Sequence, residues 1–477
     1  MSCSDLCTIL WSRCIIADKE GDPGLIKDVE DLMMEMKRKG YDLPSVPPLF
    51  RLLKGISTLP STTALIDSAL DDLAMSVAND NNPIRRQLQA KQVNFLLYSL
   101  TEGKGIVGGY ARKWQGRRRL LEVMMPVVGG YINEGDTAFT RDTAVSCLRA
   151  YARSCTINGI SNEMTYLTKE LIRDVTPWIQ KTLNDSDTLP ITWLTNMLFI
   201  YSSSSETCFD YKSEATPMVL SRIVAMLEAQ RFDIAAVKCV DIISYMSRVG
   251  IVSDVLLDYC ITNSVPSGRL LRAVCKLGIT FKQLEVLLGK EGLSVAVEDW
   301  VLPMAIAFME GEGDTRVMPG SDMIELCRTL DRARLTDDAI LGLYILKQCE
   351  GFNDVVAPLL DVDQVASPPP PPRSPTGWAL EAAGVVGDGA VPGFIMDNGY
   401  RVQLAIPSDR ISIRLVQPKG YVLQREDMAV RLSARYRARV ELMRRLGWKE
   451  ICLSAMEWIS TDNAGGKLAL IMHERVS

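Results

Sequence analysis

Cationic residues gather near the C-terminal end of the chain, in the segment VRLSARYRARVELMRRLGW and just before it. Arg431, Arg435 and Arg439 recur at four-residue spacing, which would place them along one face of a helix. Guanidinium groups bind phosphates and stack on bases, so this stripe predicts contact with nucleic acid; a merely solvated helix face is the alternative interpretation. The candidate residues of this region are Arg431, Arg435, Arg437, Arg439, Arg444 and Lys419.

A second basic cluster lies in the segment YARKWQGRRRLL, residues 110–121, where five cations surround a tryptophan. Interleaved aromatic and basic residues suit single-stranded nucleic acid, because bases stack on the ring while the cations neutralise phosphates. A solvated start of a helix explains the same pattern. The candidate residues here are Arg112, Lys113, Trp114, Arg117, Arg118 and Arg119.

Other residue types leave little material for catalysis or metal binding. The 477 residues include one histidine, His473, which disfavours histidine general bases, catalytic triads and zinc sites with histidine ligands. The twelve cysteines are scattered without a CxxC pair, as is typical of reduced, buried thiols. A GxGxxG match at residues 103–108 has no strand before it, and we interpret it as accidental. We therefore expect no metal, no cofactor and no enzymatic activity.

The long N-terminal part of the chain predicts helices. Segments such as LIKDVEDLMMEMKRKG and PMVLSRIVAMLEAQ carry apolar residues at three- and four-residue spacing. Several predicted helices end in Gly followed by Ile, at Gly159, Gly250 and Gly278, which is typical of helical hairpins. Residues 1–362 are therefore predicted to form a degenerate α-solenoid of stacked hairpins, with an irregular bundle as the alternative. No apolar segment has the roughly 18–20 residues that cross a bilayer, so we expect no membrane partner.

The composition changes at SPPPPPRSPTG, residues 367–377, where consecutive prolines favour a stiff, extended segment. Residues 363–393 are predicted to be a Pro/Gly-rich linker. In residues 394–477, YRVQLAI and ISIRLV alternate as strands do, and a helix is expected from about Glu426 to Leu446. A further strand and a final helix complete a small α/β domain, so the predicted fold class is mainly α with a C-terminal α/β domain.

The segment RRLGWKEICLSAMEWIS, residues 444–460, indicates how this domain closes. Gly447 can take the left-handed conformation that ends a helix. Ile451 and Leu453 then alternate with more polar residues, which predicts a strand. We expect Trp458 to cover the edge of the core at the corner after that strand.

With these segments in place, the C-terminal domain resembles a RAP domain, the module at the C-terminus of FAST-kinase-like and related organellar RNA-binding proteins. The resemblance covers about residues 400–475 and rests on ISIRLVQPKGYVL and RYRARVELMRRLGWKEICLSAMEWIS. Upstream, LLRAVCKLGITFKQLEVLL is similar to the degenerate helical hairpins of that family. The resemblance implies a restriction-endonuclease-like fold. A nuclease needs clustered carboxylates for a metal ion, whereas the strand before Pro418 carries Arg414 and no carboxylate, so we expect a binder.

The resemblance further implies work on RNA in the mitochondrion, in transcript stability or processing or in ribosome assembly. The expected partners are rRNA or organellar transcripts, together with ribosomal proteins. A structural subunit of the mitochondrial ribosome that contacts rRNA is the alternative, and a RAP-type endonuclease is a weaker one. Charge agrees with an RNA partner, because residues 394–477 hold 14 Lys and Arg against 9 Asp and Glu while the whole chain carries a net charge of −5. The first twenty residues include Asp5, Asp18 and Glu20 and lack the composition of a typical transit peptide.

Overall fold

The computed structural model describes residues 115–134, 139–156, 161–204, 215–290, 295–310, 321–331, 335–360 and 376–476, with scattered positions before residue 115. The chain divides into two compact units. The first ends at Met226, and the second runs from Leu227 to the C-terminal region. The GxGxxG match, the glycine helix end predicted at Gly159 and the proline run lie outside the described residues.

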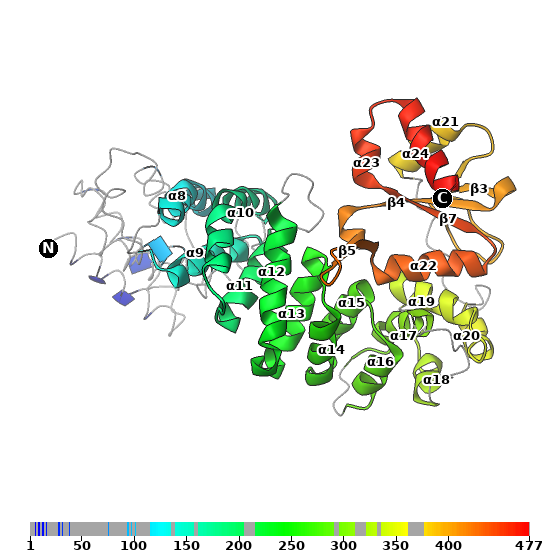
Figure 1. Ribbon diagram of the computed structural model, residues 1–477, viewed down its shortest axis with the longest axis horizontal. Coiled ribbons are helices and arrows are strands. Elements are labelled where there is room, and N and C mark those ends of the chain that lie inside the picture. The colour runs from blue at the N-terminus through cyan, green and yellow to red at the C-terminus, as the bar shows by residue number, and fades with distance from the viewer. Residues whose placement is uncertain are drawn as a thin grey trace. The chain divides into compact units, whose positions relative to one another are not determined.

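The described part of the first unit is helical, as the apolar spacing predicts (Figure 1). Thr140 begins its second helix by accepting a hydrogen bond from the backbone N–H of Thr143. In the core, Tyr151 is fully buried and its hydroxyl donates to the carbonyl of Leu121 at 2.9 Å, which ties two neighbouring helices together. The helices are α8 (Gln115–Glu134), α9 (Arg141–Ser154), α10 (Ser161–Asn184), α11 (Ile191–Ser203) and α12 (Ala215–Ala229), the last of which contains the boundary with the second unit.

The second unit begins with further helices, several of them arranged as hairpins, and these are called the helical repeat below. Gly250 ends the first complete helix in the left-handed conformation (φ 78°), and its N–H donates to the carbonyl of Met246. Gly278 ends another helix at φ 123°, so both predicted glycine helix ends are confirmed. The helices are α13 (Ala236–Val249), α14 (Asp254–Asn263), α15 (Gly268–Leu277), α16 (Phe281–Leu288), α17 (Glu298–Glu310), α18 (Ser321–Arg328), α19 (Asp337–Lys347) and α20 (Asn353–Leu360).

A small α/β domain follows, and it confirms the mainly helical fold class with a mixed C-terminal region. Its larger sheet has the strand order β2-β3-β4-β7, in which β4 and β7 run parallel and α22 (Ala434–Arg445) connects them. The other elements of this layer are α21 (Gly377–Val386), β2 (Val391–Pro392), β3 (Leu404–Ile406), β4 (Ile411–Val416), β7 (Lys449–Ser454), α23 (Ala455–Ser460) and α24 (Ala464–Val476).

The predicted linker, residues 363–393, extends too far. Helix α21 and strand β2 lie within that range, and Ala382 of α21 is fully buried in the apolar core of the sheet. The domain therefore includes the residues from Gly377 onward and does not start at residue 394. The alternation of polar and apolar residues that identifies strands could not reveal this part of the domain, because its first described element is a short helix rich in Ala and Gly.

The helix predicted from Glu426 to Leu446 is shorter than expected. The residues before Ser433 form a hairpin of β5 (Tyr421–Gln424) and β6 (Val430–Leu432). Asp427 lies in the turn of this hairpin, and its carboxylate accepts a hydrogen bond from the N–H of Ala429 at 2.9 Å. On its other side, β5 pairs in parallel with β1 (Ile251–Val252), the segment just after Gly250. The helical repeat and the α/β domain thus share one small sheet of order β1-β5-β6.

The closing segment has the predicted form. At the end of α22, Gly447 takes the left-handed conformation (φ 76°), and the N–H groups of Gly447 and Trp448 donate to the carbonyls of Arg444 and Met443. Strand β7 then alternates buried and partly exposed residues. Trp458 is buried in the core, and its indole N–H donates to Glu381 at 3.3 Å, so its predicted packing role is confirmed.

Candidate nucleic-acid interface

Helix α22 carries four of the five arginines predicted in the C-terminal region, and it lies between the larger sheet and the helical repeat (Figure 1). It contacts β6 and β7 on one side and α15, α17 and α19 on the other. The helices approach closely at Gly278, where a Cβ atom would lie 3.0 Å from Oε2 of Glu310 and 4.0 Å from Cβ of Ala434. The surroundings of each arginine side chain therefore depend on the side of the helix from which it projects.

Two arginines of α22 form ion pairs with carboxylates of the helical repeat. Nη2 of Arg435 lies 2.7 Å from Oδ1 of Asp338, and Nε of Arg437 donates to Oε1 of Glu310 at 3.0 Å. Arg437 also donates to the carbonyl of Leu432 at 2.7 Å, which fixes the start of α22. Burial raises the pKa of Glu310, and the charge of Arg437 opposes that shift. Both arginines thus contribute to docking the α/β domain.

A third ion pair joins the residue after β5 to the C-terminal end of α12, which belongs to the second unit. Nη2 of Arg425 lies 2.6 Å from Oε2 of Glu228, and the neighbouring Gln424 amide donates to Asp254 at 2.9 Å. These contacts lie beside the shared strand pairing of β1 and β5. Sequence reasoning missed Arg425, because its partner is distant along the chain and no local pattern indicates it.

Arg431, Arg444 and Lys419 are exposed, but they do not form one stripe with the other arginines. Arg431 lies on β6 rather than on the helix and pairs with Asp427 at 2.6 Å. Arg444 forms a two-pronged pair with Glu441, with both N to O distances 2.6 Å. These hydrogen bonds, together with the one from Arg445, lower the pKa of Glu441 to about 2. Lys419, in the short 3-10 helix η5 (Pro418–Gly420), makes no ion pair with another described residue.

Arg439 is not on the solvated face where the four-residue spacing places it. It is buried against the sheet, where its Nε donates to Oε1 of Glu450 at 2.9 Å and its Nη1 donates to the hydroxyl of Tyr400 at 2.6 Å. The apolar side of α22 includes Ala438 and Leu442, so Arg439 shares the buried side of the helix. The prediction of a continuous stripe through residues 431, 435 and 439 is therefore wrong.

The basic cluster before and within α8 is only partly described. Arg112, Lys113 and Trp114 lie outside the described residues, and so does the side chain of Arg117. Arg118 donates to Glu122 at 2.6 Å and to Glu163 of α10 at 3.5 Å. Arg119 is exposed and makes no ion pair with another described residue.

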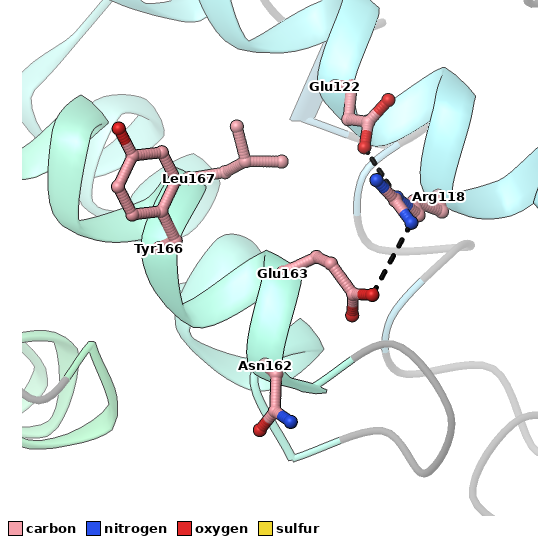
Figure 2. Close-up of a pocket in the computed structure, with 6 residues that line it drawn as sticks. All are labelled: Arg118, Glu122, Asn162, Glu163, Tyr166 and Leu167. Carbon is pink, nitrogen blue, oxygen red and sulfur yellow. Dashed lines mark hydrogen bonds and ion pairs between the residues drawn. The ribbon is translucent and has the colours of Figure 1, made fainter.

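An open pocket of about 390 Å³ adjoins Arg118 between α8 and α10 (Figure 2). Its lining residues are Arg118, Glu122, Asn162, Glu163, Tyr166 and Leu167. Two carboxylates face one guanidinium group here, so the described lining carries no surplus of positive charge. This pocket by itself is a poor match for a phosphate backbone.

The structure also brings together residues that sequence reasoning left apart. Parallel pairing of β4 with β7 sets Ser412 opposite Glu450, which places this carboxylate beside Arg414 and Arg439. Glu450 follows Gly447 in the predicted strand, but its partners come from two other elements. No spacing rule connects them, because strand register is a long-range property.

Comparison with known protein families finds no match for this chain, and comparison with curated proteins finds no similar sequence. The resemblance to RAP domains therefore stays a hypothesis. Within the described ranges, no three His, Cys, Asp or Glu side chains gather as a metal site. None of the helices in the described part of the chain has the length and hydropathy to span a bilayer.

Proposed function

We propose that this protein binds RNA, and that the exposed arginines of α22 and of the β5–β6 hairpin contact RNA phosphates. The observation that carries the proposal is the exposure of these charged groups. The side chains of Arg431, Arg435 and Arg444 are 51%, 48% and 70% exposed. Lys419 adds an exposed ammonium group in the same domain. Arginine is well suited to this role, because its planar group binds phosphate oxygens in pairs.

The carboxylate partners of these arginines do not prevent phosphate binding. An exposed ion pair contributes only about 0–1 kcal/mol, since water screens both charges. A phosphate contact instead releases condensed counterions from the nucleic acid, which is the main source of affinity for such partners. Exchange of Asp427, Asp338 or Glu441 for a phosphate is therefore energetically accessible.

The cellular role that we propose is the one that the RAP resemblance implies. The protein would act in the mitochondrion, on transcript stability or processing or on ribosome assembly, as a binder without nuclease activity. Its partners would be organellar transcripts or rRNA, with ribosomal proteins nearby. Imaging of the tagged full-length protein tests the compartment, and a wholly cytosolic signal would refute it.

Crosslinking tests the proposed interface. Full-length protein is irradiated with single-stranded RNA that contains 4-thiouridine, and the crosslinked peptides are identified by mass spectrometry. We expect crosslinks in residues 417–446 and their loss in a variant with Arg435→Gln and Arg444→Gln. Crosslinks that are absent, or unchanged in that variant, would contradict the proposed interface. Sedimentation of an organellar extract then separates a free RNA factor from a ribosome-bound protein.

A further inference from the structure

The two faces of the larger sheet differ in their chemistry. Ile413 of β4 and Ile451 of β7 face an apolar core that includes residues of α21, α23 and α24. The alternate residues of the same strands, Ser412, Arg414 and Glu450, lie on the opposite face, where Glu450 meets Arg439 of α22. A helix covering a sheet normally buries apolar side chains, so a charged layer at this position needs an explanation.

One carboxylate in this layer faces two guanidinium groups. The side chain of Glu450 is wholly buried, and its Oε2 accepts from the hydroxyl of Ser412 at 2.5 Å. Its Oε1 accepts from Nε of Arg439 at 2.9 Å and lies 3.4 Å from Nε of Arg414. Because both guanidinium groups approach the same oxygen, they lie close together. With two guanidinium groups and one carboxylate, the cluster carries one more positive charge than negative charge.

The two arginines also retain unused hydrogen-bond donors. Nη2 of Arg439 and Nε of Arg414 are buried and have no hydrogen-bond partner among the described residues. The side chain of Arg439 is 9% exposed, whereas that of Arg414 is 18% exposed and reaches solvent. Burial lowers the pKa of Arg414, and the charge of Arg439 lowers it further. Buried donors are nearly always paired in folded proteins, so these two donors call for a second acceptor with negative charge besides Glu450.

We propose that Arg414 and Arg439 form a binding site for a single phosphate group, which enters from the partly exposed side of Arg414. A phosphate supplies both the negative charge and the acceptor oxygens that the cluster lacks. Access past one partly exposed arginine suits a terminal or free phosphate rather than a continuous strand. The site is therefore distinct from the exposed arginines proposed to contact the RNA backbone.

Calorimetric titration of the full-length protein tests the site. The probes are inorganic phosphate, uridine 5′-monophosphate and two RNA oligonucleotides that differ only in a 5′-phosphate, all at matched ionic strength. We expect phosphate binding that weakens at least tenfold in Arg414→Gln. Arg410→Gln is the matched control, because Arg410 is an exposed arginine just before β4 that makes no ion pair with another described residue. Its phosphate affinity should equal that of the wild type.

A second variant raises the net positive charge of the cluster, whereas Arg414→Gln lowers it. Glu450→Gln removes the only carboxylate of the cluster and keeps an acceptor oxygen, so phosphate should bind more tightly than to the wild type. A thermal unfolding transition verifies that each variant is folded. If the wild type binds no phosphate probe, or binds equally well with Arg414→Gln, the cluster is a structural ion pair and the proposal fails.

The oligonucleotides separate this proposal from the proposed function. Tighter binding of the 5′-phosphorylated RNA assigns the site to RNA ends, whereas binding of phosphate and the monophosphate alone assigns it to a small phosphorylated molecule. Either result supports the site. Affinity for the 5′-hydroxyl RNA reports on the surface arginines alone, so loss of one activity is distinguishable from loss of the other.

Discussion

Two helices of the molecule, α8 and α22, each carry a cluster of arginines, but the arginines meet different surroundings. In α8, Arg118 pairs within its own helix and with the adjacent α10. In α22, Arg435 and Arg437 reach carboxylates of the helical repeat, while Arg439 is buried against the sheet. The difference arises because α22 is covered on two sides, by the sheet and by the helical repeat.

This comparison shows that a run of cations does not by itself define a binding surface. Each arginine of α22 meets one of three environments, namely solvent, another part of the chain or a buried polar layer. The loss of folding stability on removing an arginine should depend on its environment. Exposed ion pairs contribute little to stability, whereas a buried charge without a partner is strongly unfavourable.

The largest effect is expected from Arg439→Ala. This change leaves Glu450 buried without its closest cation, so the free energy of unfolding should fall by about 3–5 kcal/mol. Arg118→Ala, the matched change in α8, should lower it by at most about 1 kcal/mol, because the Arg118 pairs are exposed. Urea denaturation monitored by circular dichroism measures both. Equal losses in the two variants would show that the environments do not differ as described.

A smaller effect is expected from Gly278→Ala, which probes the docking of α22 on the helical repeat. Gly278 has φ 123° and ψ 159°, a region that is accessible essentially only to glycine, and the new Cβ would lie 3.0 Å from Glu310. We expect a loss of about 1–3 kcal/mol in unfolding free energy. Gly384→Ala in α21 serves as the control, because no described residue outside the local helix backbone comes within 4 Å of the position that its new Cβ would take. An unchanged free energy of unfolding in Gly278→Ala would mean that docking of α22 does not require this close approach.

The smallest effect is expected from Asp338→Asn, which releases Arg435 from its carboxylate partner. If Arg435 contacts RNA, affinity should rise by up to about fivefold, the equivalent of an exposed ion pair of at most about 1 kcal/mol. Glu350→Gln removes an equal charge from an exposed position with no ion pair to another described residue. Fluorescence anisotropy with labelled single-stranded RNA compares the two. An equal rise in both would indicate a general charge effect rather than release of Arg435.

Local features of this fold were predictable from the sequence, whereas long-range ones were not. Gly250, Gly278 and Gly447 end helices as the residues around them predict, and β4 and β7 form strands as expected, because these features depend on neighbouring residues. The pairing of Ile251 with Leu423 and the burial of Arg439 depend on segments far apart in the chain. The same holds for the candidate site, where types and positions of the cations were visible but their partners were not.

The most direct test of the account is the salt dependence of RNA binding. A variant with Arg431→Gln, Arg435→Gln and Arg444→Gln is compared with the wild type, and a control replaces three exposed cations of the helical repeat with Gln. The control residues are Lys238, Arg248 and Lys282. If the three arginines contact RNA, their variant alone should bind more weakly, with a log–log salt slope that is shallower by about 0.7 for each lost contact. An unchanged affinity and slope in that variant, or an equal change in the control, would contradict RNA binding by these arginines.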